Sequence, residues 1–365
     1  MKVLVVSAKL NIGGAQSVAA NIAKYADDSM KFDYLVFGDE IGEYEEMIIN
    51  KGNRVLHFPV ANNQTFGFLK RLIRLMKEEK YDAVHAHTMF NCGVVMLAAK
   101  ISGVPCRVSH SHTIAIEGKT SLARRIYNIC MRALICKCGN EYVACGVEAG
   151  YALYGKKWFD KYGTVIKNGI DFDSYAYSEH NRSVIREKYN LNGKFVIGHV
   201  GHYETVKNQV FLIDIFKRIK EEKSNAVLLL FGEGSKRAFL ESEIEKRNLQ
   251  NDVFLMGNIN NVNEVLSAFD VFAFPSLFEG TPLALIEAQA NGVPCVISDA
   301  IPPDACIKDD IVRLSLSDVD TWIKMINDSK RNINSIQISN LVTNYEDVNE
   351  SMRKIYNMYS KYMEG

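Results

Sequence analysis

The segment 275–283 has residue types that could bind an anion, and it stands between an apolar run and a helical one. Its Gly280-Thr281 pair leaves backbone N–H groups free to meet a phosphate, and Pro282 suits the first turn of a helix. Glu279 stands immediately before the pair. The segment therefore predicts a phosphate site, with a plain helix start as the alternative.

Glu287 lies eight residues after Glu279, inside the predicted helix 283–290. The other residues of that helix are mostly apolar, where a solvated glutamate is less expected. We predict that both carboxylates face a ligand. An exposed surface glutamate is the alternative for the second of them.

A basic pair follows the predicted strand 195–200. His202 and Lys207 stand near the start of the next helix, where free backbone N–H groups already favour an anion. A lysine in this position can neutralise phosphate oxygens, although many surface helices also begin with lysine.

Two His-x-His pairs end successive predicted strands: His85 with His87, and His110 with His112. Residues two apart share one face of a strand, so the side chains of each pair can converge. Zinc is one use of such pairs, but no acidic or cysteine side chain stands beside them in the sequence. We favour a polar lining that hydrogen-bonds sugar hydroxyls, with one or two of the four serving as structural histidines.

The first predicted strand leads into Gly13 and Gly14, and then into a helical segment. A glycine turn before a helix lets an anion or a sugar approach the backbone closely. The pattern is not GxGxxG, so the dinucleotide fingerprint is absent from this turn. A tight strand-to-helix turn without a ligand is the alternative.

Short apolar runs alternate with helical segments along the chain, in two series. Several runs are continuous in Val, Ile and Leu, as expected for parallel strands covered on both faces. The repeated strand–helix–strand order predicts an α/β protein with two open, doubly wound sheets. Ligands of such sheets bind beyond the carboxyl ends of the strands, which is where the residues above stand. The expected strands are 2–7, 34–37, 54–58, 83–87, 107–110, 142–145, 164–166, 195–200, 226–231, 253–256, 271–274, 294–298 and 312–314.

A turn at 167–171, followed by a polar stretch, predicts the domain boundary. We expect an N-terminal domain over 1–172 and a C-terminal domain over 173–345. The length of 365 residues agrees, because a single core stops growing near about 250–300 residues. The final segment, 346–365, is predicted to be mostly helical and could pack on either domain.

Composition excludes several classes of protein. Apolar residues make up 47% of the chain and charged residues 24%, which are globular values, and the 43 basic and 43 acidic residues leave no net charge to attract nucleic acid. No run approaches the roughly 18–20 apolar residues of a membrane span, and the N-terminus does not resemble a signal peptide. The eight cysteines form no CxxC pair, which favours reduced thiols and a cytoplasmic location.

Basic residues are concentrated in the first half of the chain, with 12 basic and 4 acidic residues between 61 and 137. The predicted helices 66–80 and 123–137 each combine an apolar stripe with basic neighbours. Such helices suit an anionic membrane surface, which predicts a peripheral membrane protein. The alternative is a stripe that faces the core and has a solvated charged rim.

Together these motifs resemble glycosyltransferase family 4, and within it bacterial capsular and exopolysaccharide transferases. The span from Glu279 to Glu287 matches the family's ExxxxxxxE motif, including the GTPLALI between the two carboxylates. His202 and Lys207 stand where the family has Arg-x4-Lys. Further matches are the hinge at 165–171, the strand end at 231–234, Gly13-Gly14, His85-x-His87 and His112.

The resemblance implies a GT-B fold, in which two Rossmann-like domains face a central cleft, and a retaining sugar transfer from a nucleotide diphosphate sugar. Lys207 would neutralise the diphosphate, Glu287 would hold the ribose hydroxyls, and Glu279 would bind the sugar. His112 would face the sugar near the reacting carbon, which makes His112, Lys207 and Glu279 the candidate catalytic residues. The donor set also includes Gly14, His202, Gly280, Thr281, Pro282 and Leu283, and further acceptor or sugar contacts would come from Gly13, His85, His87 and His110.

The resemblance also implies no cofactor and no metal, a uridine nucleotide by family frequency, and a lipid-linked glycan as acceptor. The final helix would cross back to the N-terminal domain. One position departs from the family, because His202 replaces an arginine, and an imidazole is not permanently charged. Other open interpretations are a transferase with a water-soluble acceptor, a nucleotide-sugar epimerase of the same architecture, and a two-lobed solute-binding protein.

Overall fold

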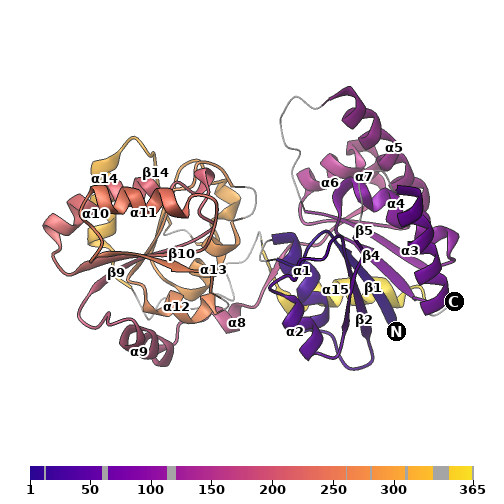
Figure 1. Ribbon diagram of the computed structural model, residues 1–365, viewed down its shortest axis with the longest axis horizontal. Helices are drawn as coiled ribbons and strands as arrows, with labels where there is room; N and C mark the ends of the chain where they lie inside the picture. The colour runs from indigo at the N-terminus through magenta and orange to yellow at the C-terminus, as the bar shows by residue number, and fades with distance from the viewer. Residues whose placement is uncertain are drawn as a thin grey trace. The chain divides into compact units, whose positions relative to one another are not determined.

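A computed structural model describes residues 1–11, 14–59, 65–112, 121–259, 261–279, 282–308, 311–331 and 345–363. The chain divides into two compact units (Figure 1): the first runs from indigo to magenta and includes the final helix in yellow, and the second runs from magenta through orange to gold. The N-terminal unit comprises Met1–Gly169 together with Glu346–Gly365, and the C-terminal unit is Ile170–Tyr345. The final helix therefore belongs to the N-terminal unit.

The N-terminal unit is built on a seven-stranded parallel sheet in the order β3-β2-β1-β4-β5-β6-β7. The strand order reverses between β1 and β4, which creates the switch point where ligands of such sheets bind. Its strands are β1 (Lys2–Ser7), β2 (Lys31–Val36), β3 (Arg54–His57), β4 (Ala83–Ala86), β5 (Cys106–Ser111), β6 (Glu141–Ala144) and β7 (Gly163–Val165).

Alternate residues of each central strand enter different cores. In β1, Leu4 and Val6 pack under one group of helices, whereas Val3 and Val5 pack under the other. This explains why the strand is apolar throughout, since a parallel sheet is covered on both faces. The first group is α3 (Thr65–Glu79), α4 (Cys92–Ile101), α5 (Leu122–Cys138), α6 (Val147–Tyr154) and α7 (Lys156–Tyr162), and the second is α1 (Gly14–Lys24), α2 (Glu45–Asn50) and α15 (Val348–Ser360).

The C-terminal unit repeats the plan with a six-stranded parallel sheet in the order β11-β10-β9-β12-β13-β14. The switch point lies between β9 and β12. The strands are β9 (Phe195–Val200), β10 (Ala226–Phe231), β11 (Val253–Gly257), β12 (Val271–Phe274), β13 (Cys295–Ser298) and β14 (Val312–Leu314).

Helices also cover both faces of this second sheet. Leu228 and Leu230 face one core, and Val227 and Leu229 face the other. The first core is closed by α10 (Gln209–Glu222), α11 (Arg237–Lys246) and α14 (Val319–Asp328), and the second by α9 (Glu179–Lys188), α12 (Val262–Ala268) and α13 (Leu283–Asn291).

The remaining short elements belong to both units. They are α8 (Phe172–Tyr175), β8 (Gly169–Ile170), β15 (Glu346–Asp347) and the 3₁₀ turns Met89–Asn91, Thr205–Lys207 and Pro303–Ala305.

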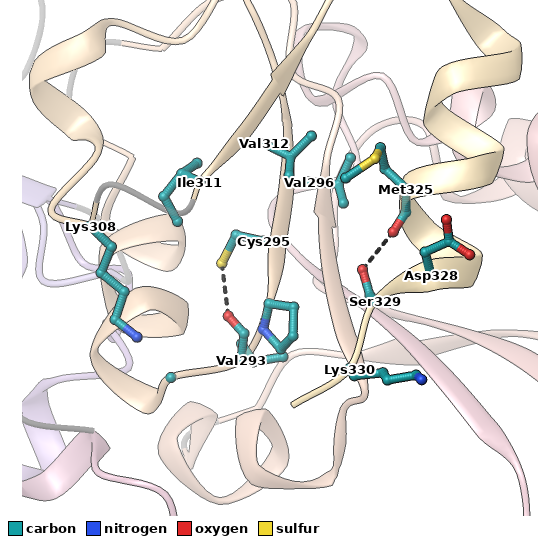
Figure 2. A pocket seen from close by; sticks show the side chains of 12 residues that line it. Val293, Cys295, Val296, Lys308, Ile311, Val312, Met325, Asp328, Ser329 and Lys330 are labelled. Carbon is teal, nitrogen blue, oxygen red and sulfur yellow. Dashed lines mark hydrogen bonds between the residues drawn. The ribbon is translucent and has the colours of Figure 1, made fainter. Parts of the chain in front are cut away.

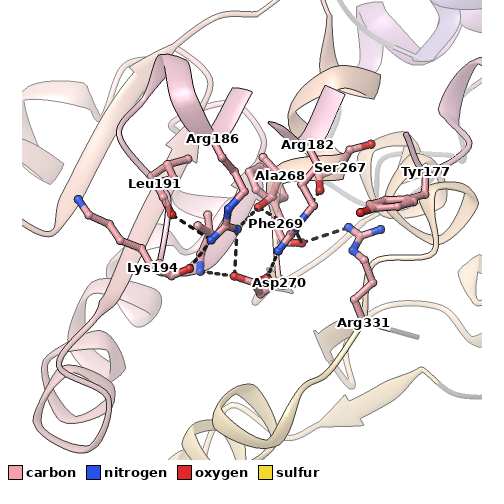
Figure 3. Close-up of polar contacts among 12 residues, drawn as sticks. Tyr177, Arg182, Arg186, Leu191, Lys194, Ser267, Ala268, Phe269, Asp270 and Arg331 are labelled. Atoms are coloured by element: carbon pink, nitrogen blue, oxygen red, sulfur yellow. Dashed lines mark hydrogen bonds and ion pairs between the residues drawn. The ribbon is translucent and has the colours of Figure 1, made fainter. Parts of the chain in front are cut away.

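A half-buried carboxylate, that of Asp270, ties α9 to the amino ends of β9 and β12 (Figure 3). Asp270 accepts hydrogen bonds from Arg182 at 2.7 Å, Arg186 at 3.3 Å and the backbone N–H of Val196 at 2.8 Å. Arg331 donates to the carbonyl groups of Leu266 and Phe269 at the end of α12. Guanidinium groups are favourable at a helix C-terminus, so this cluster stabilises the edge opposite the carboxyl ends of the strands.

All thirteen expected strands are present, most with ends shifted by one to three residues. Of the two helices with an apolar stripe and basic neighbours, α3 fits the alternative of a stripe that faces the core. Its apolar stripe, including Leu72 and Met76, is buried in the core because α3 packs on α4. The stripe of α5 differs, since Leu122, Ile126 and Ile129 are exposed.

Candidate functional site

Two loops at the carboxyl edge of the C-terminal sheet carry most of the predicted donor residues. One loop follows β9 and the other follows β12, the two strands that flank the switch point. They are joined by a hydrogen bond from the N–H of Leu277 to the carbonyl of Val206, at 2.8 Å. The amide of Asn208 also donates to the carbonyl of Pro275, at 3.3 Å. The topology thus places residues some 70 positions apart in one site.

Lys207 and Glu279 form an ion pair between these loops. Lys207 Nζ lies 2.6 Å from Glu279 Oε1, and the two side chains are only 18% and 10% exposed. The ammonium also lies 5.3 Å from the ring centre of Phe274, at the end of β12. Sequence reasoning assigned the two residues to the same ligand but did not predict that they contact each other. A phosphate or a sugar hydroxyl arriving here would meet a charged donor and a charged acceptor already in place.

A second layer of polar residues lies beneath Lys207, and sequence reasoning missed it. His199 is fully buried in β9, and its Nδ1 donates to the carbonyl of Ala273 at 3.0 Å. Burial lowers the pKa of His199 to about 4, so the ring is neutral beside the lysine. Gln209 donates to the carbonyl of His202 at 2.8 Å and fixes the loop. A polar residue inside an apolar strand was the one sequence signal for His199.

His202 itself is exposed on this loop, and its Nδ1 lies 3.3 Å from the carbonyl of Glu233. Pro282 precedes α13 and does not occupy its first turn, which corrects the expectation from sequence. Its carbonyl accepts the N–H groups of Leu285 and Ile286, and the helix begins at Leu283. The predicted phosphate-binding pair, Gly280 and Thr281, lies outside the described residues.

Glu287 lies on α13, and its carboxyl is in an apolar environment. The hydroxyl of Tyr175, in α8, donates to Glu287 Oε1 at 2.9 Å. Burial raises the pKa of Glu287 to about 7, and the hydrogen bond from Tyr175 partly opposes this effect. A carboxyl group with such a shift, next to a predicted phosphate loop, is a candidate for ligand binding.

The four histidines of the N-terminal unit come together at the carboxyl ends of β4 and β5. They form two hydrogen-bonded pairs, His85 Nε2 with His110 Nδ1 at 3.1 Å and His87 Nδ1 with His112 Nε2 at 2.8 Å. The pairs stack on each other, with ring centres 4.3 Å apart for His85 and His87 and 4.1 Å apart for His110 and His112. Tyr359 of α15 lies 2.6 Å from His85 Nδ1. We call these four residues the histidine stack.

The histidine stack is neutral, because burial depresses the pKa of every member. The pKa of His85 falls to about 3 and that of His112 to about 4, and the pKa values of His87 and His110 are well below the ordinary value. A neutral ring has one N–H and one lone pair, so each pair shares a single hydrogen bond. The Nε2 atoms of His87 and His110 are buried and have no partner among the described residues, so their hydrogen-bonding capacity is unused.

A metal ion is the other use of such a cluster. Ring nitrogens of His85, His87 and His110 lie within 4.8 Å of one another. Both ring nitrogens of His85 are already hydrogen-bonded, to Tyr359 and to His110, so of these three described residues only His87 and His110 keep an unpartnered ring nitrogen, fewer than the three or four ligands of a zinc site. The geometry therefore fits a hydrogen-bonding lining better than a metal centre.

Gly14 begins α1 directly after the first strand and its loop, whereas Gly13 lies outside the described residues. A pocket of about 220 Å³ lies elsewhere in the C-terminal unit (Figure 2). It is lined by Val293 and Cys295 at the start of β13, by Val312 and by Ser329. Val293, Cys295 and Val312 stand at the amino ends of β13 and β14, so this pocket is separate from the candidate site.

Comparisons with known proteins agree with this arrangement. Residues 12–174 match the family model described as Glycosyltransferase Family 4, and residues 181–328 match Glycosyl transferases group 1. A Bacillus subtilis (strain 168) protein named as the glycosyltransferase EpsF is 34% identical over 89% of this chain and 86% of its own length. The Escherichia coli UDP-Gal:alpha-D-GlcNAc-diphosphoundecaprenol alpha-1,3-galactosyltransferase is 28% identical over 79% of this chain and 77% of its own.

The fold is also that of a solved structure. The crystal structure of Anabaena Alr3699/HepE in complex with UDP-glucose superposes with a TM-score of 0.79, covering 99% of this chain and all of that one at 20% identity. The two parallel sheets, each with a switch point, are those of the GT-B fold. The chain belongs to the family 4 (group 1) glycosyltransferases.

Proposed function

We propose that the protein transfers a hexose or N-acetylhexosamine, with retention of configuration, from a UDP-sugar to a lipid-linked glycan of a cell-surface polysaccharide. The observation that carries the proposal is the Lys207–Glu279 ion pair at the switch point of the C-terminal sheet. This pair presents a cation for the diphosphate and an acceptor for sugar hydroxyls within one small volume. The names of two relatives, one with a diphosphoundecaprenol-linked acceptor and one from capsular polysaccharide biosynthesis, support the acceptor class.

In this proposal the C-terminal unit holds the donor. Lys207 neutralises the diphosphate, helped by N–H groups at the start of α13, and Glu279 accepts a hydrogen bond from the sugar. Glu287 accepts the two ribose hydroxyls. These contacts stabilise the diphosphate as it leaves and acquires charge, so a metal ion is not required for this step.

The N-terminal unit binds the acceptor and completes the reaction. The acceptor hydroxyl attacks the anomeric carbon on the face from which the diphosphate departs, and the carbon–oxygen bond to the phosphate breaks. The hydroxyl proton passes to the leaving phosphate oxygen, which keeps the step balanced. His112 hydrogen-bonds the donor sugar, and the unpartnered nitrogens of His87 and His110 bind hydroxyl groups of the acceptor or of the sugar.

The lipid-linked acceptor also calls for a membrane contact, and α5 offers one. Leu122, Ile126 and Ile129 are 72%, 54% and 66% exposed and share one face of the helix, beside the exposed Arg124 and Arg125. An apolar stripe with a basic flank favours an anionic interface. None of the described helices is long and apolar enough to cross a membrane. We therefore propose peripheral attachment to the inner face of the plasma membrane.

The test is a transfer assay with a panel of UDP-sugars and an undecaprenyl-diphosphate-linked N-acetylhexosamine, with the product's anomeric configuration read by NMR. A product with the donor's configuration supports the proposal, and Glu279→Gln should lower its rate. An inverted product would contradict retention. Conversion of the UDP-sugar without any acceptor would favour the epimerase, and transfer only to a water-soluble sugar would favour the alternative acceptor.

A further inference from the structure

Two residues of helix α13 form hydrogen bonds with a single residue of α8, Tyr175. The carboxyl of Glu287 accepts a hydrogen bond from the hydroxyl of Tyr175, and one turn later Asn291 donates to the carbonyl of Tyr175, both at 2.9 Å. Residues four apart lie on one face of a helix, so the same face of α13 fixes both ends of Tyr175. The phenol is therefore held in place by more than its contact with the carboxyl group.

The surroundings of this contact are apolar. Tyr175 and Phe172 pack against an apolar cluster formed by Ile170, at the start of the C-terminal unit, Ile286 of α13 and Ile307. Glu287 is itself partly exposed, so a ligand can reach it, while burial of its carboxyl group in these surroundings raises its pKa to about 7. The hydrogen bond from a phenol stabilises the ionised carboxylate and so acts in the opposite direction.

We propose that Tyr175 is a positioning residue, whose hydroxyl orients the Glu287 carboxylate and keeps it ionised so that it can accept the vicinal hydroxyls of a nucleotide's ribose. The proposal rests on the proposed function, in which Glu287 contacts the nucleotide. An ionised carboxylate has about four acceptor positions, so the phenol leaves room for two ribose hydroxyls. A protonated carboxyl group would instead offer a donor to one of them and bind the pair less well.

The sign of the pH dependence follows from this assignment. Ribose hydroxyls favour the ionised form, so nucleotide affinity falls as the pH falls through the pKa of Glu287 in the free protein. Removing the phenol removes a contact that lowers this pKa, and the loss of affinity should therefore begin at a higher pH. Other titratable groups on elements around α13 are Asp173 in α8, Glu264 in α12, Cys295 in β13 and Tyr345 in the same apolar cluster.

The experiment measures UDP affinity by calorimetry between about pH 5.5 and 9 for the full chain, Tyr175→Phe and Glu287→Gln. We expect Tyr175→Phe to bind UDP about tenfold less tightly at pH 7, with the midpoint of its affinity loss about one pH unit higher. Glu287→Gln should keep only the change that comes from the terminal phosphate of UDP, which titrates at about pH 6 and is common to all three proteins, and this separates Glu287 from the other titratable groups.

Tyr177→Phe is the matched control, because Tyr177 also donates to a carboxylate, Glu179, but on the surface. It should behave as the wild type does. Unchanged affinity and midpoint in Tyr175→Phe, or tighter binding because the phenol competes with the ribose, would overturn the proposal. A wild-type protein that binds no UDP at any pH would instead overturn the proposed function.

Discussion

At the residue scale, we expect the Lys207–Glu279 pair to have two roles. Each partner neutralises the charge of the other in a largely buried position, and Lys207 also binds the diphosphate of UDP. Removing one partner therefore leaves an uncompensated charge. We predict that Lys207→Ala weakens UDP binding by roughly 1.5–3 kcal/mol, the range for a hydrogen bond to a charged group. Calorimetry at pH 8 measures this loss directly.

The double variant Lys207→Met, Glu279→Leu provides the control for folding. It removes both charges and leaves neither partner uncompensated. Its thermal unfolding temperature should therefore differ less from that of the wild type than the unfolding temperature of Lys207→Ala does. If Lys207→Ala binds UDP as tightly as the wild type, the lysine does not contact the diphosphate.

The histidine stack leads to a prediction about pH and stability. All four imidazoles have depressed pKa values in the folded protein, whereas in the unfolded chain they titrate near 6.5. As the pH falls below about 6.5, the unfolded chain takes up protons that the folded protein does not, so the free energy of unfolding falls. Each buried histidine contributes about 1.4 kcal/mol per pH unit to this slope. Glu287 has the opposite effect on the free energy of unfolding. Because its pKa is raised in the folded protein, it gains a proton there between about pH 7 and 4.5, before it does so in the unfolded chain.

Urea unfolding of wild type and His110→Gln at pH 7 and pH 5 measures the slope. The variant loses one contributor, so its stability should fall less steeply towards pH 5. His180→Gln is the control, because it also removes one histidine, but from the surface of α9 and outside the histidine stack. Equal slopes in His110→Gln and the wild type would show that this ring is protonated in the folded protein.

At the element scale, α3 and α5 show what periodicity can and cannot predict. Both have apolar residues every three to four positions beside basic ones, so both fit either a core face or an interface. The structure buries the stripe of α3 under α4 and leaves part of α5 exposed. Which helix receives a covering neighbour depends on the tertiary arrangement, and no single-helix pattern contains that information.

The exposed stripe of α5 leads to a prediction about membranes. Ile126→Glu places a charge in the middle of the stripe and should strongly reduce flotation with vesicles that contain anionic lipid. Phe239→Glu is the control, because Phe239 is 48% exposed on α11 of the other unit and should not matter. Wild-type flotation that is equal on neutral and anionic vesicles, or unaffected by Ile126→Glu, would count against the proposed surface.

Residues with a local role at a helix start can be recognised in the sequence, whereas contacts between distant elements cannot. The loop before α13 was recognisable because glycine, proline and glutamate have specific uses at a helix start. Tyr175 was not, because its contact with Glu287 spans 112 positions and joins two separate helices. His199 and Gln209 were missed for a similar reason, since a buried polar residue shows its partners only after the strands are aligned.

At the scale of the whole molecule, the sequence was sufficient for the architecture. Two series of apolar runs separated by helices predict two parallel sheets, and the rule for switch points places the candidate residues at the carboxyl ends of the strands. The contact between Lys207 and Glu279 could not be predicted in this way. It depends on side-chain reach across neighbouring strands, which spacing along the chain does not encode.

Each unit has its own hydrophobic cores, and this leads to a prediction for the whole chain. Calorimetric unfolding should show two transitions, one for each unit. UDP should raise the midpoint temperature of the transition that belongs to the C-terminal unit. At a UDP concentration of about 100 times Kd, the gain is about 2.7 kcal/mol, or a shift of roughly 5–10 °C for a unit of this size. Two core variants identify the transitions. Leu228→Ala should lower the midpoint temperature of the C-terminal transition alone, and Val84→Ala that of the N-terminal transition alone.

The same measurement tests the proposed independence from metal. Lysine and helix N–H groups would supply the charge that binds the diphosphate, so the UDP shift should be the same with excess EDTA as without it. Lys207→Ala should reduce the shift under both conditions. A shift that disappears with EDTA and returns with Mg²⁺ would mean that a metal ion bridges the diphosphate. Lys207 would then contribute to the site mainly by holding Glu279 in place.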